Sequence, residues 1–331
     1  MQDPQITAAV TQSSPVRGEG SAAPVIQADW DAFDPWRVQA LRHRLHEHPL
    51  MQLDSLIELG ERLQKVSKVR AFSNAATVAT DFNSVAKQFP HSGGPTDTLR
   101  RIAEAGAWML LGSVQTDAAY RTLVDEGLDE FDARISPRDP GMFCRAGWII
   151  ISSPHTVTPF HMDKGNGVLL HVAGDKTIHV WEADDVDVVS EHARDRYHHR
   201  GSLDKVQWRE EYRERAQVFR LKPGDGVYMP STSPHMVETH DTPAITITLT
   251  YNTPRTRRNA LLHATHDILR EKGIAPPRVD AHPLLDGVAY AGVRTMLAAR
   301  ELGRRVRGRP SIEFTGKYAI PGEYGDGRLS R

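Results

Sequence analysis

The spacing of hydrophobic residues along this chain changes once, close to residue 140. Between residues 28 and 140 the apolar positions recur mainly at helical intervals, as Leu56, Leu59 and Leu63 do. Further helices are predicted over residues 97–111 and 117–126, a short strand over 69–72 and a loop over 88–96. The segment 28–140 is therefore expected to be mainly helical.

After residue 140, short runs rich in β-branched residues alternate with turn residues. Many short strands at such spacing are typical of an all-β barrel or sandwich. The predicted strands cover residues 147–152, 156–162, 168–172, 176–181, 217–221, 226–229, 235–239 and 244–251. The mostly charged interval 182–216 interrupts them and is predicted to be an insertion with a helical second half, with His198 and His199 in a solvated loop.

The two ends of the chain differ in character. Residues 1–27 are rich in Gln, Ser, Ala, Gly and Pro without a periodic apolar face, so a disordered tail is expected. Helical spacing returns over residues 257–273 and 284–305, and residues 312–331 are expected to be a tail or a surface wrap. The predicted organisation is a tail (1–27), a helical region packing on the core (28–140), a β core (141–255) and a C-terminal helical part (256–331).

Composition narrows the function classes. The 331 residues suffice for one large domain or two modest ones, and a formal charge of −1 gives no reason to expect a nucleic-acid partner. A single cysteine, Cys144, excludes an internal disulfide and fits a reducing compartment. No apolar run approaches membrane-spanning length, and the N-terminus lacks the order of a signal peptide. A cytoplasmic protein with no membrane partner is expected.

Three residues in the β-rich part suggest a metal site. His161 and Asp163 are an i, i+2 pair, and such residues point to the same side of a strand. His235 would have to arrive from another strand. Two imidazoles and one carboxylate on one face of a metal leave the opposite face open, as in non-haem Fe(II) oxygenases. The His-x-Asp pattern alone is weak, because 16 histidines supply about one by chance, and a surface strand with outward polar residues is the alternative.

The second half of the pattern is more specific. The tight turn Lys222-Pro-Gly-Asp-Gly leads into a short apolar strand and is followed by His235. With this turn and the His161/Asp163 pair, segment 141–255 resembles the cupin-like JmjC family of Fe(II)- and 2-oxoglutarate-dependent oxygenases. The resemblance implies a mainly β protein with flanking helices and a double-stranded β-helix (jelly-roll) core. It also implies Fe(II), 2-oxoglutarate and O2 as reactants, with His161, Asp163 and His235 as both metal ligands and catalytic residues.

The resemblance extends to cosubstrate residues. In the family a lysine fifteen residues after the first histidine pairs with the far carboxylate of 2-oxoglutarate, and a hydroxyl residue three before it contacts the same group; here these are Lys176 and Thr158. A dicarboxylate in an apolar barrel needs such a cation and donor. Family members often carry asparagine at the position of Gly167, and the neighbouring Asn166 is the candidate here. For a tyrosine contributed from upstream in some relatives, the candidates are Tyr120 and Tyr228.

The expected activity is hydroxylation of an amino-acid side chain in a protein, a peptide or a small molecule. Two alternatives stay open: a metal-dependent cupin isomerase or cosubstrate-free dioxygenase, which commonly uses more histidines, and a non-catalytic cupin-like binding or regulatory protein. C-terminal helices form a dimer interface in some JmjC relatives, so the resemblance also implies a homodimer through residues 257–305. The Arg-rich C-terminal region is expected to be a solvated helix face, with recruitment of an acidic partner as the alternative.

Overall fold

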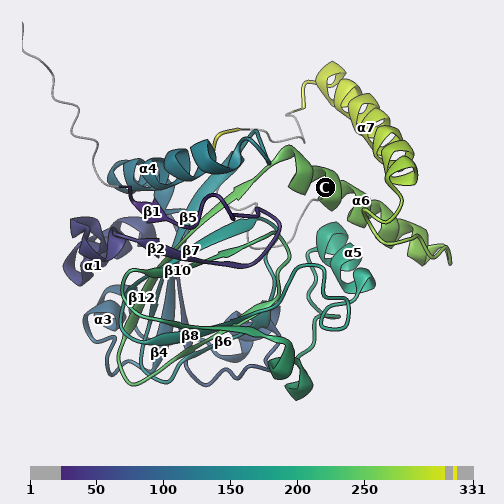
Figure 1. The fold of residues 1–331 in the computed structure, drawn as a ribbon. Coiled ribbons are helices and arrows are strands. Elements are labelled where there is room, and N and C mark those ends of the chain that lie inside the picture. Colours follow the sequence, from purple (N-terminus) through teal and green to yellow (C-terminus); the bar gives the residue numbers. More distant parts are fainter. Residues whose placement is uncertain (1–23, 310–315, 319–331) are drawn as a thin grey trace, which may run out of the picture.

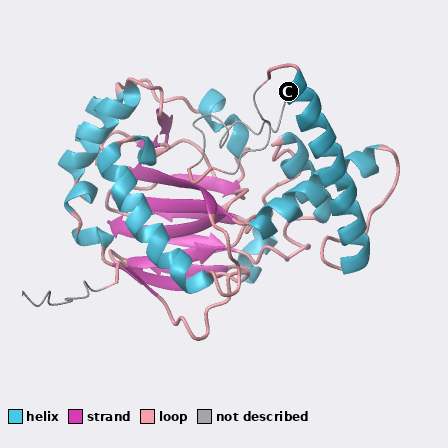
Figure 2. Ribbon diagram, turned by 90° about the horizontal axis from the view of Figure 1, so that it is seen from above, coloured by secondary structure: helices cyan, strands magenta, loops and turns pink. Residues whose placement is uncertain are grey.

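Two antiparallel sheets form the centre of the protein. The computed structural model describes residues 24–309 and 316–318, and helices flank the strands (Figures 1 and 2). The larger sheet has eight strands in the order β1-β2-β10-β7-β12-β5-β4-β3, and the smaller has four in the order β6-β11-β8-β9. The mainly β fold with flanking helices and a jelly-roll core, expected from the sequence, is confirmed.

The strands of the larger sheet are β1 (Ile26–Gln27), β2 (Gln39–His43), β3 (Val69–Ser73), β4 (Ala107–Leu111), β5 (Phe143–Ser152), β7 (Asn166–Ala173), β10 (Asp225–Met229) and β12 (Ala244–Asn252). Those of the smaller sheet are β6 (Val157–His161), β8 (Lys176–Val180), β9 (Gln217–Leu221) and β11 (His235–Thr239). All the strands predicted after residue 140 are present, with ends close to those expected. Turn residues bound each run, which is why the sequence signal was clear.

The helices are α1 (Leu53–Gln64), α2 (Val85–Gln88), α3 (Pro95–Arg100), α4 (Ala118–Ile135), α5 (Glu191–Arg200), α6 (Pro254–Glu271) and α7 (Pro283–Val306). Short 3-10 turns are η1 (Leu45–Glu47), η2 (Pro49–Met51), η3 (Phe82–Ser84), η4 (Val114–Thr116) and η5 (Glu210–Arg215). Among these described helices, none combines the length and the apolarity needed to cross a membrane.

The helix predicted over 97–111 is wrong in its second half. Helix α3 ends at Arg100, Gly106 takes a left-handed φ of +57°, and Ala107–Leu111 form strand β4 between β3 and β5. Four of the five residues of β4 are buried, and a continuous apolar run lacks the alternation that distinguishes a strand from a buried helix. Since β2, β3 and β4 belong to the larger sheet, segment 28–140 is less purely helical than expected.

Each face of the larger sheet has its own apolar core. The outer face packs under α1 and α4 in a cluster that includes Leu59, Phe131, Ile247 and Leu249. The inner face meets the smaller sheet through a second cluster to which both sheets contribute, and this cluster contains Val38, Leu169, Ile178, Val180, Leu221, Val227, Met229 and Val237. Because Ile247 and Leu249 of β12 face the helices, Thr246, Thr248 and Thr250 must face the space between the sheets.

The insertion 182–216 contains α5, which packs against α6; the helix expected in its second half lies mainly in the first, and the second half carries only the 3-10 turn η5. His198 and His199, expected in a solvated loop, both lie in α5: His198 has 2% exposure and its ring stacks on that of His263 in α6, and His199 pairs with Asp267 at 2.7 Å. That expectation is wrong because both histidines face the interface between the two helices. Helix α7 projects beyond the body (Figure 1). The tail expected over 1–27 falls outside the described residues up to residue 23, and at its end the expectation is wrong, because Ile26–Gln27 form β1 and Ile26 is buried. The tail expected over 312–331 lies outside the described residues except for residues 316–318.

Candidate metal and cosubstrate site

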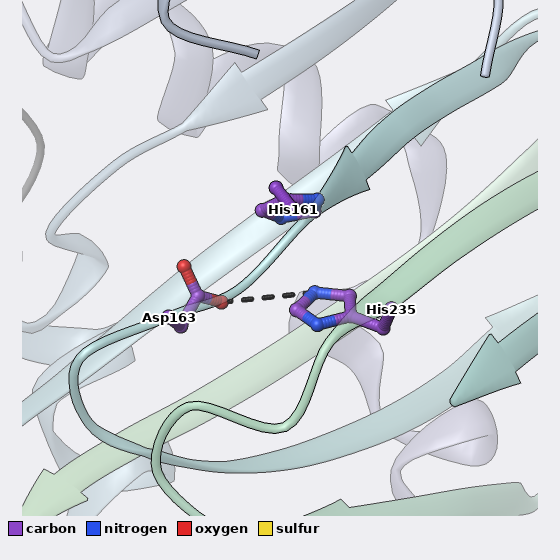
Figure 3. A group of neighbouring side chains, drawn as sticks. All are labelled: His161, Asp163 and His235. Atoms are coloured by element: carbon purple, nitrogen blue, oxygen red, sulfur yellow. Dashed lines mark ion pairs between the residues drawn. The ribbon is translucent and has the colours of Figure 1, made fainter. Parts of the chain in front are cut away.

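The antiparallel pairing of β6 with β11 brings His161 and His235 together. His161 is the last residue of β6 and His235 the first of β11, and the register sets them directly opposite each other. Their ring centroids are 4.1 Å apart. The sequence required His235 to reach His161 from another strand, and the fold brings it there (Figure 3).

A bulge in β6 explains the spacing between Thr158 and His161. The register pairs His235 with His161 but Val237 with Thr158, so β6 advances one residue more than β11. In an unbroken strand, residues three apart point to opposite faces; an extra residue restores a common face. Thr158 therefore shares the face of His161, His235 and Val237, and Val237 belongs to the apolar cluster between the sheets.

Asp163 lies two residues beyond the end of β6 and completes the group. Its Oδ2 lies 3.8 Å from Nε2 of His235 (Figure 3), and its side chain is 53% exposed while both histidines are buried. One ligand atom from each of the three residues can be chosen so that all lie within 4.8 Å of one another. This geometry fits three ligands of one ion whose open side faces solvent near Asp163.

The loops that carry Asp163 and His235 are fastened to each other. The backbone N–H of Thr232 donates to the carbonyl of Asp163 at 2.8 Å, and the Ser231 hydroxyl donates to the carbonyl of Lys164 at 2.7 Å. The Ser231 N–H donates to Oδ1 of Asn166 at 2.9 Å. These bonds couple the segment that follows His161 and Asp163 to the segment that precedes His235. They fix the separation between candidate ligands that are remote in sequence.

Backbone contacts orient both imidazoles for coordination. Nδ1 of His161 lies 2.7 Å from the carbonyl of Pro159, and Nδ1 of His235 lies 3.1 Å from that of Ser233. A carbonyl only accepts, so each Nδ1 carries the proton and each Nε2 keeps its lone pair. Burial and the neighbouring His235 lower the pKa of His161 to about 3, which keeps its ring neutral. Neutral imidazoles held by a second hydrogen bond are suited to bind a metal.

Lys176 lies further along the same inner face. It is the first residue of β8 and pairs with Thr239 of β11, whereas His235 pairs with Val180 at the other end of β8. Its ammonium group is buried and donates to the Thr246 hydroxyl at 2.9 Å, and burial lowers the pKa of Lys176 to about 7. No carboxylate among the described residues is paired with it. A buried cation with one neutral partner fits an anionic ligand group.

The other residues predicted to contact the cosubstrate, Asn166, Tyr120 and Tyr228, differ in their surroundings. Asn166 uses Oδ1 to hold Ser231, whereas its buried Nδ2 has no hydrogen-bond partner among the described residues. The register sets Asn166 opposite Tyr251, on the helix-covered face, so its cosubstrate contact stays a prediction. Tyr120 and Tyr228 belong to the apolar cluster under the helices, and their hydroxyls donate to backbone carbonyls: Tyr120 to Leu50 at 2.7 Å and Tyr228 to Pro35 at 2.8 Å.

One neighbour of the site had no sequence signal. The ring of Phe82, from η3, lies parallel to that of His161, with centroids 3.8 Å apart and an interplanar angle of 2°. Phe82 stands in a loop without periodicity and nearly eighty residues before His161, so neither spacing nor pattern connects the two. Only the path of the chain across β6 brings them together.

A second cluster of potential ligands joins α5 to α6. Ligand atoms of Glu191, Asp195 and His263 also lie within 4.8 Å of one another. Asp195, however, already accepts from Nδ1 of His263 and from Nε of Arg270, both at 2.7 Å. Glu191 lies 3.5 Å from Arg194. These pairs neutralise the carboxylates, so we interpret the cluster as a structural network of the helix interface.

No curated protein matches the chain. Among solved structures, the X-ray structure of Escherichia coli ycfD is 17% identical, with 82% of this chain and 68% of that chain covered and a TM-score of 0.48. YcfD, described as a ribosomal oxygenase, in complex with cobalt and 2-oxoglutarate is 16% identical, with 82% and 67% covered and a TM-score of 0.46.

A third similar structure, the DMSP lyase DddQ from Ruegeria pomeroyi, is 20% identical over 32% of this chain and 38% of that one, with a TM-score of 0.22. At these values the structural matches say nothing about the activity of this chain. The family comparison is more extensive, because the model of the cupin-like domain matches residues 7–257, about three quarters of the sequence. In agreement with the resemblance found in the sequence, the chain belongs to the cupin-like domain family.

Proposed function

We propose that this protein is an Fe(II)- and 2-oxoglutarate-dependent oxygenase that hydroxylates an amino-acid side chain in a protein, a peptide or a small molecule. The observation that carries the proposal is the convergence of His161, Asp163 and His235 at one end of the inner face, with Lys176 buried further along it. Two imidazoles and one carboxylate leave coordination positions free for a bidentate cosubstrate and O2. Bound there, Fe(II) would activate O2, the oxidant: one oxygen atom would go to the substrate C–H and the other to 2-oxoglutarate, which would leave as succinate and CO2.

The roles of the protein side chains follow from their environment. The two free Nε2 atoms and the Asp163 carboxylate would hold the metal. The ammonium group of Lys176, with the hydroxyl of Thr158, would bind the far carboxylate of 2-oxoglutarate, where little water competes. Asn166 would act on the cosubstrate site through the loop before His235, which its Oδ1 holds, because its register places it on the helix-covered face. The apolar residues between the sheets would exclude water from the reacting centre.

The residues present fit these groups on three counts. Both histidines have a protonated Nδ1 bound to a backbone carbonyl, so the nitrogen that remains is a ligand rather than a donor. The Asp163 carboxylate is solvent-accessible on the side where a substrate would approach. The Lys176 ammonium has a hydroxyl as its hydrogen-bond partner and can accept an anionic partner.

We further propose that three segments of the chain have different roles. Residues 141–255, with insertion 182–216, would form the catalytic core, and residues 28–140 would support it. The C-terminal part, 256–331, would form a homodimer interface. Helix α7 supports this last role because several of its apolar side chains, among them Leu284, Val288 and Met296, are more than half exposed.

Anaerobic titration of the Fe(II)-loaded protein with 2-oxoglutarate tests the function. A weak visible charge-transfer band that grows with 2-oxoglutarate is expected, since chelation of the metal by the keto acid produces it. Bound iron without a band would favour an isomerase or a cosubstrate-free dioxygenase. Failure to bind iron would favour a binding or regulatory protein. The variant Lys176→Met should retain iron but need far more 2-oxoglutarate for the same absorbance.

A further inference from the structure

Phe82 belongs to a segment that crosses the edge of the smaller sheet. Strand β6 is the outermost strand of that sheet, and the N–H of Phe160 in β6 donates to the carbonyl of Val78 at 3.1 Å. The chain then reaches η3, where the carboxylate of Asp81 caps the turn by accepting from the N–H of Asn83. We call residues 77–84 the strap. It comes from the connection between β3 and β4, outside the strands that carry the ligands.

The strap is held at both of its ends. The first end is held by the bond from Phe160 to Val78, and the N–H of Thr77 donates to the hydroxyl of Thr80 at 3.0 Å within the strap, which closes its first turn. At the other end, the side-chain amide of Asn83 donates to the carbonyl of Gly201, the residue that ends α5, at 3.3 Å. Phe82 packs against two apolar clusters, one containing Phe160 and Trp181 and the other Phe72 and Trp108. These contacts therefore fix the position of the Phe82 ring.

Stacking of Phe82 on His161 limits a rotation of the imidazole ring that the hydrogen bond to Pro159 still permits. The bond from Nδ1 to Pro159 still permits limited rotation of the imidazole about its Cβ–Cγ bond, because hydrogen bonds tolerate a range of angles. The lone pair of Nε2 lies in the plane of the ring, so this rotation would turn it away from Asp163 and His235. With the ring of Phe82 parallel at 3.8 Å, any such rotation pushes the two rings into each other.

We propose that Phe82 is a positioning residue for the metal ligand His161: its ring sets the plane of the imidazole and thereby the geometry and affinity of the metal site. The inference rests on the proposed function, because it takes His161, Asp163 and His235 as metal ligands. Phe82 acts through His161 and is not itself a ligand. Partners of metal ligands outside the coordination sphere commonly contribute about 10–100-fold to metal affinity.

The full-length protein loaded with Co(II) provides the test. Cobalt d–d bands report the ligand geometry, and a titration gives the dissociation constant, so neither readout depends on turnover. For Phe82→Leu we expect about tenfold weaker binding of Co(II) and shifted d–d bands, because leucine fills apolar space without a flat face. Phe82→Tyr retains the ring and should restore the spectrum and the affinity of the original protein.

Phe89→Leu is the matched control. Phe89 packs against the same apolar cluster as Phe82 but makes no ring contact with His161 among the described residues. It should lower Tm without moving the d–d bands. An unchanged Phe82→Leu spectrum and affinity, or an equal change in Phe89→Leu, would overturn the positioning role alone. A protein that binds no Co(II), or a His161→Ala variant with undiminished Co(II) binding, would instead reject the proposed metal site.

Discussion

Asp163 Oδ2 and His235 Nε2 are 3.8 Å apart, too far for a hydrogen bond and close enough for two ligands of one ion. The separation is maintained by the bond from Thr232 N–H to the Asp163 carbonyl and not by a direct contact of the two side chains. The two side chains are thus spaced as two ligands of one metal ion would be. The coupled loops hold them at this spacing, so binding of an ion would cost little further ordering of the side chains.

Asp163→Ala should abolish hydroxylation and weaken binding of Fe(II) or Co(II) by at least about a hundredfold, because it removes a direct ligand and not an outer partner. The fold should persist, since the Asp163 side chain is half exposed and its carbonyl still binds Thr232. Metal titration and succinate formation measure the two effects. Asp241→Ala, at a highly exposed acidic residue, is the control and should change neither. Full turnover by Asp163→Ala would remove Asp163 from the site.

Binding of 2-oxoglutarate should take up a proton at mildly alkaline pH. Burial lowers the pKa of Lys176 from its usual 10.5 to about 7, so the unliganded amine is mostly neutral at pH 8. A carboxylate beside it favours the ammonium form and raises the pKa again. Calorimetry at pH 8 in buffers of different ionisation enthalpy should therefore detect uptake approaching one proton. Affinity should fall as the pH rises above about 7, because deprotonation must be reversed on binding.

Lys176→Met removes this linkage and should weaken 2-oxoglutarate binding by about tenfold or more, the effect of losing a charge-assisted hydrogen bond. The control is Lys222→Met, at an exposed lysine in the turn before β10. It should leave both affinity and proton uptake unchanged. If Lys176→Met binds as the original protein does, with the same uptake, the ammonium group does not hold the cosubstrate.

The sequence predicted best those strands in which apolar and polar residues alternate. In β12, Ile247 and Leu249 face the helices while Thr246 and Thr248 face the sheets' interior, and such alternation marks a strand unambiguously. Strand β4 lacks this signal because apolar residues occupy both of its faces.

The candidate site residues could likewise be predicted where a sequence pattern exists. His161 and Asp163 were found from their local i, i+2 spacing, and His235 and Lys176 from their positions in the motifs of the resembling family. The Phe82 contact depends on the path of a loop that has no period, and the burial of His198 depends on packing between α5 and α6. Local patterns carry no information about either, since both arise from the tertiary fold.

The free energy of unfolding should fall in acid because several histidines are buried in neutral form. Burial lowers the pKa of His43 and His171 to about 4, and the pKa of His198 lies well below the usual 6.5. For such groups the unfolded chain binds the extra proton first. Their stabilising contribution is complete above pH 6.5 and is lost as the pH falls toward the lowered pKa, at about 1.4 kcal/mol per pH unit for each histidine.

His198→Phe tests one member of this set. Phenylalanine keeps a ring to stack on His263 but cannot be protonated beside Lys164 and Arg194, the cations that disfavour the charged form of His198. Chemical denaturation at pH 7.5 and 5.5 should show a loss on acidification that is smaller by about 1 kcal/mol in the variant. An equal loss in both proteins would mean that His198 does not contribute to the acid sensitivity.

Helix α7 should mediate self-association. Its outward face exposes Leu284, Val288, Met296 and Leu302 by 87%, 74%, 61% and 64%, an apolar stripe that a monomer would leave in water. Sedimentation should therefore give about twice the chain mass of 36.9 kDa, as expected for a twofold interface. Val288→Glu places a charge in the stripe and should yield the monomer. Val218→Glu, at a half-exposed valine on β9, should leave the dimer intact. A single 36.9 kDa species for the unchanged protein would contradict the interface.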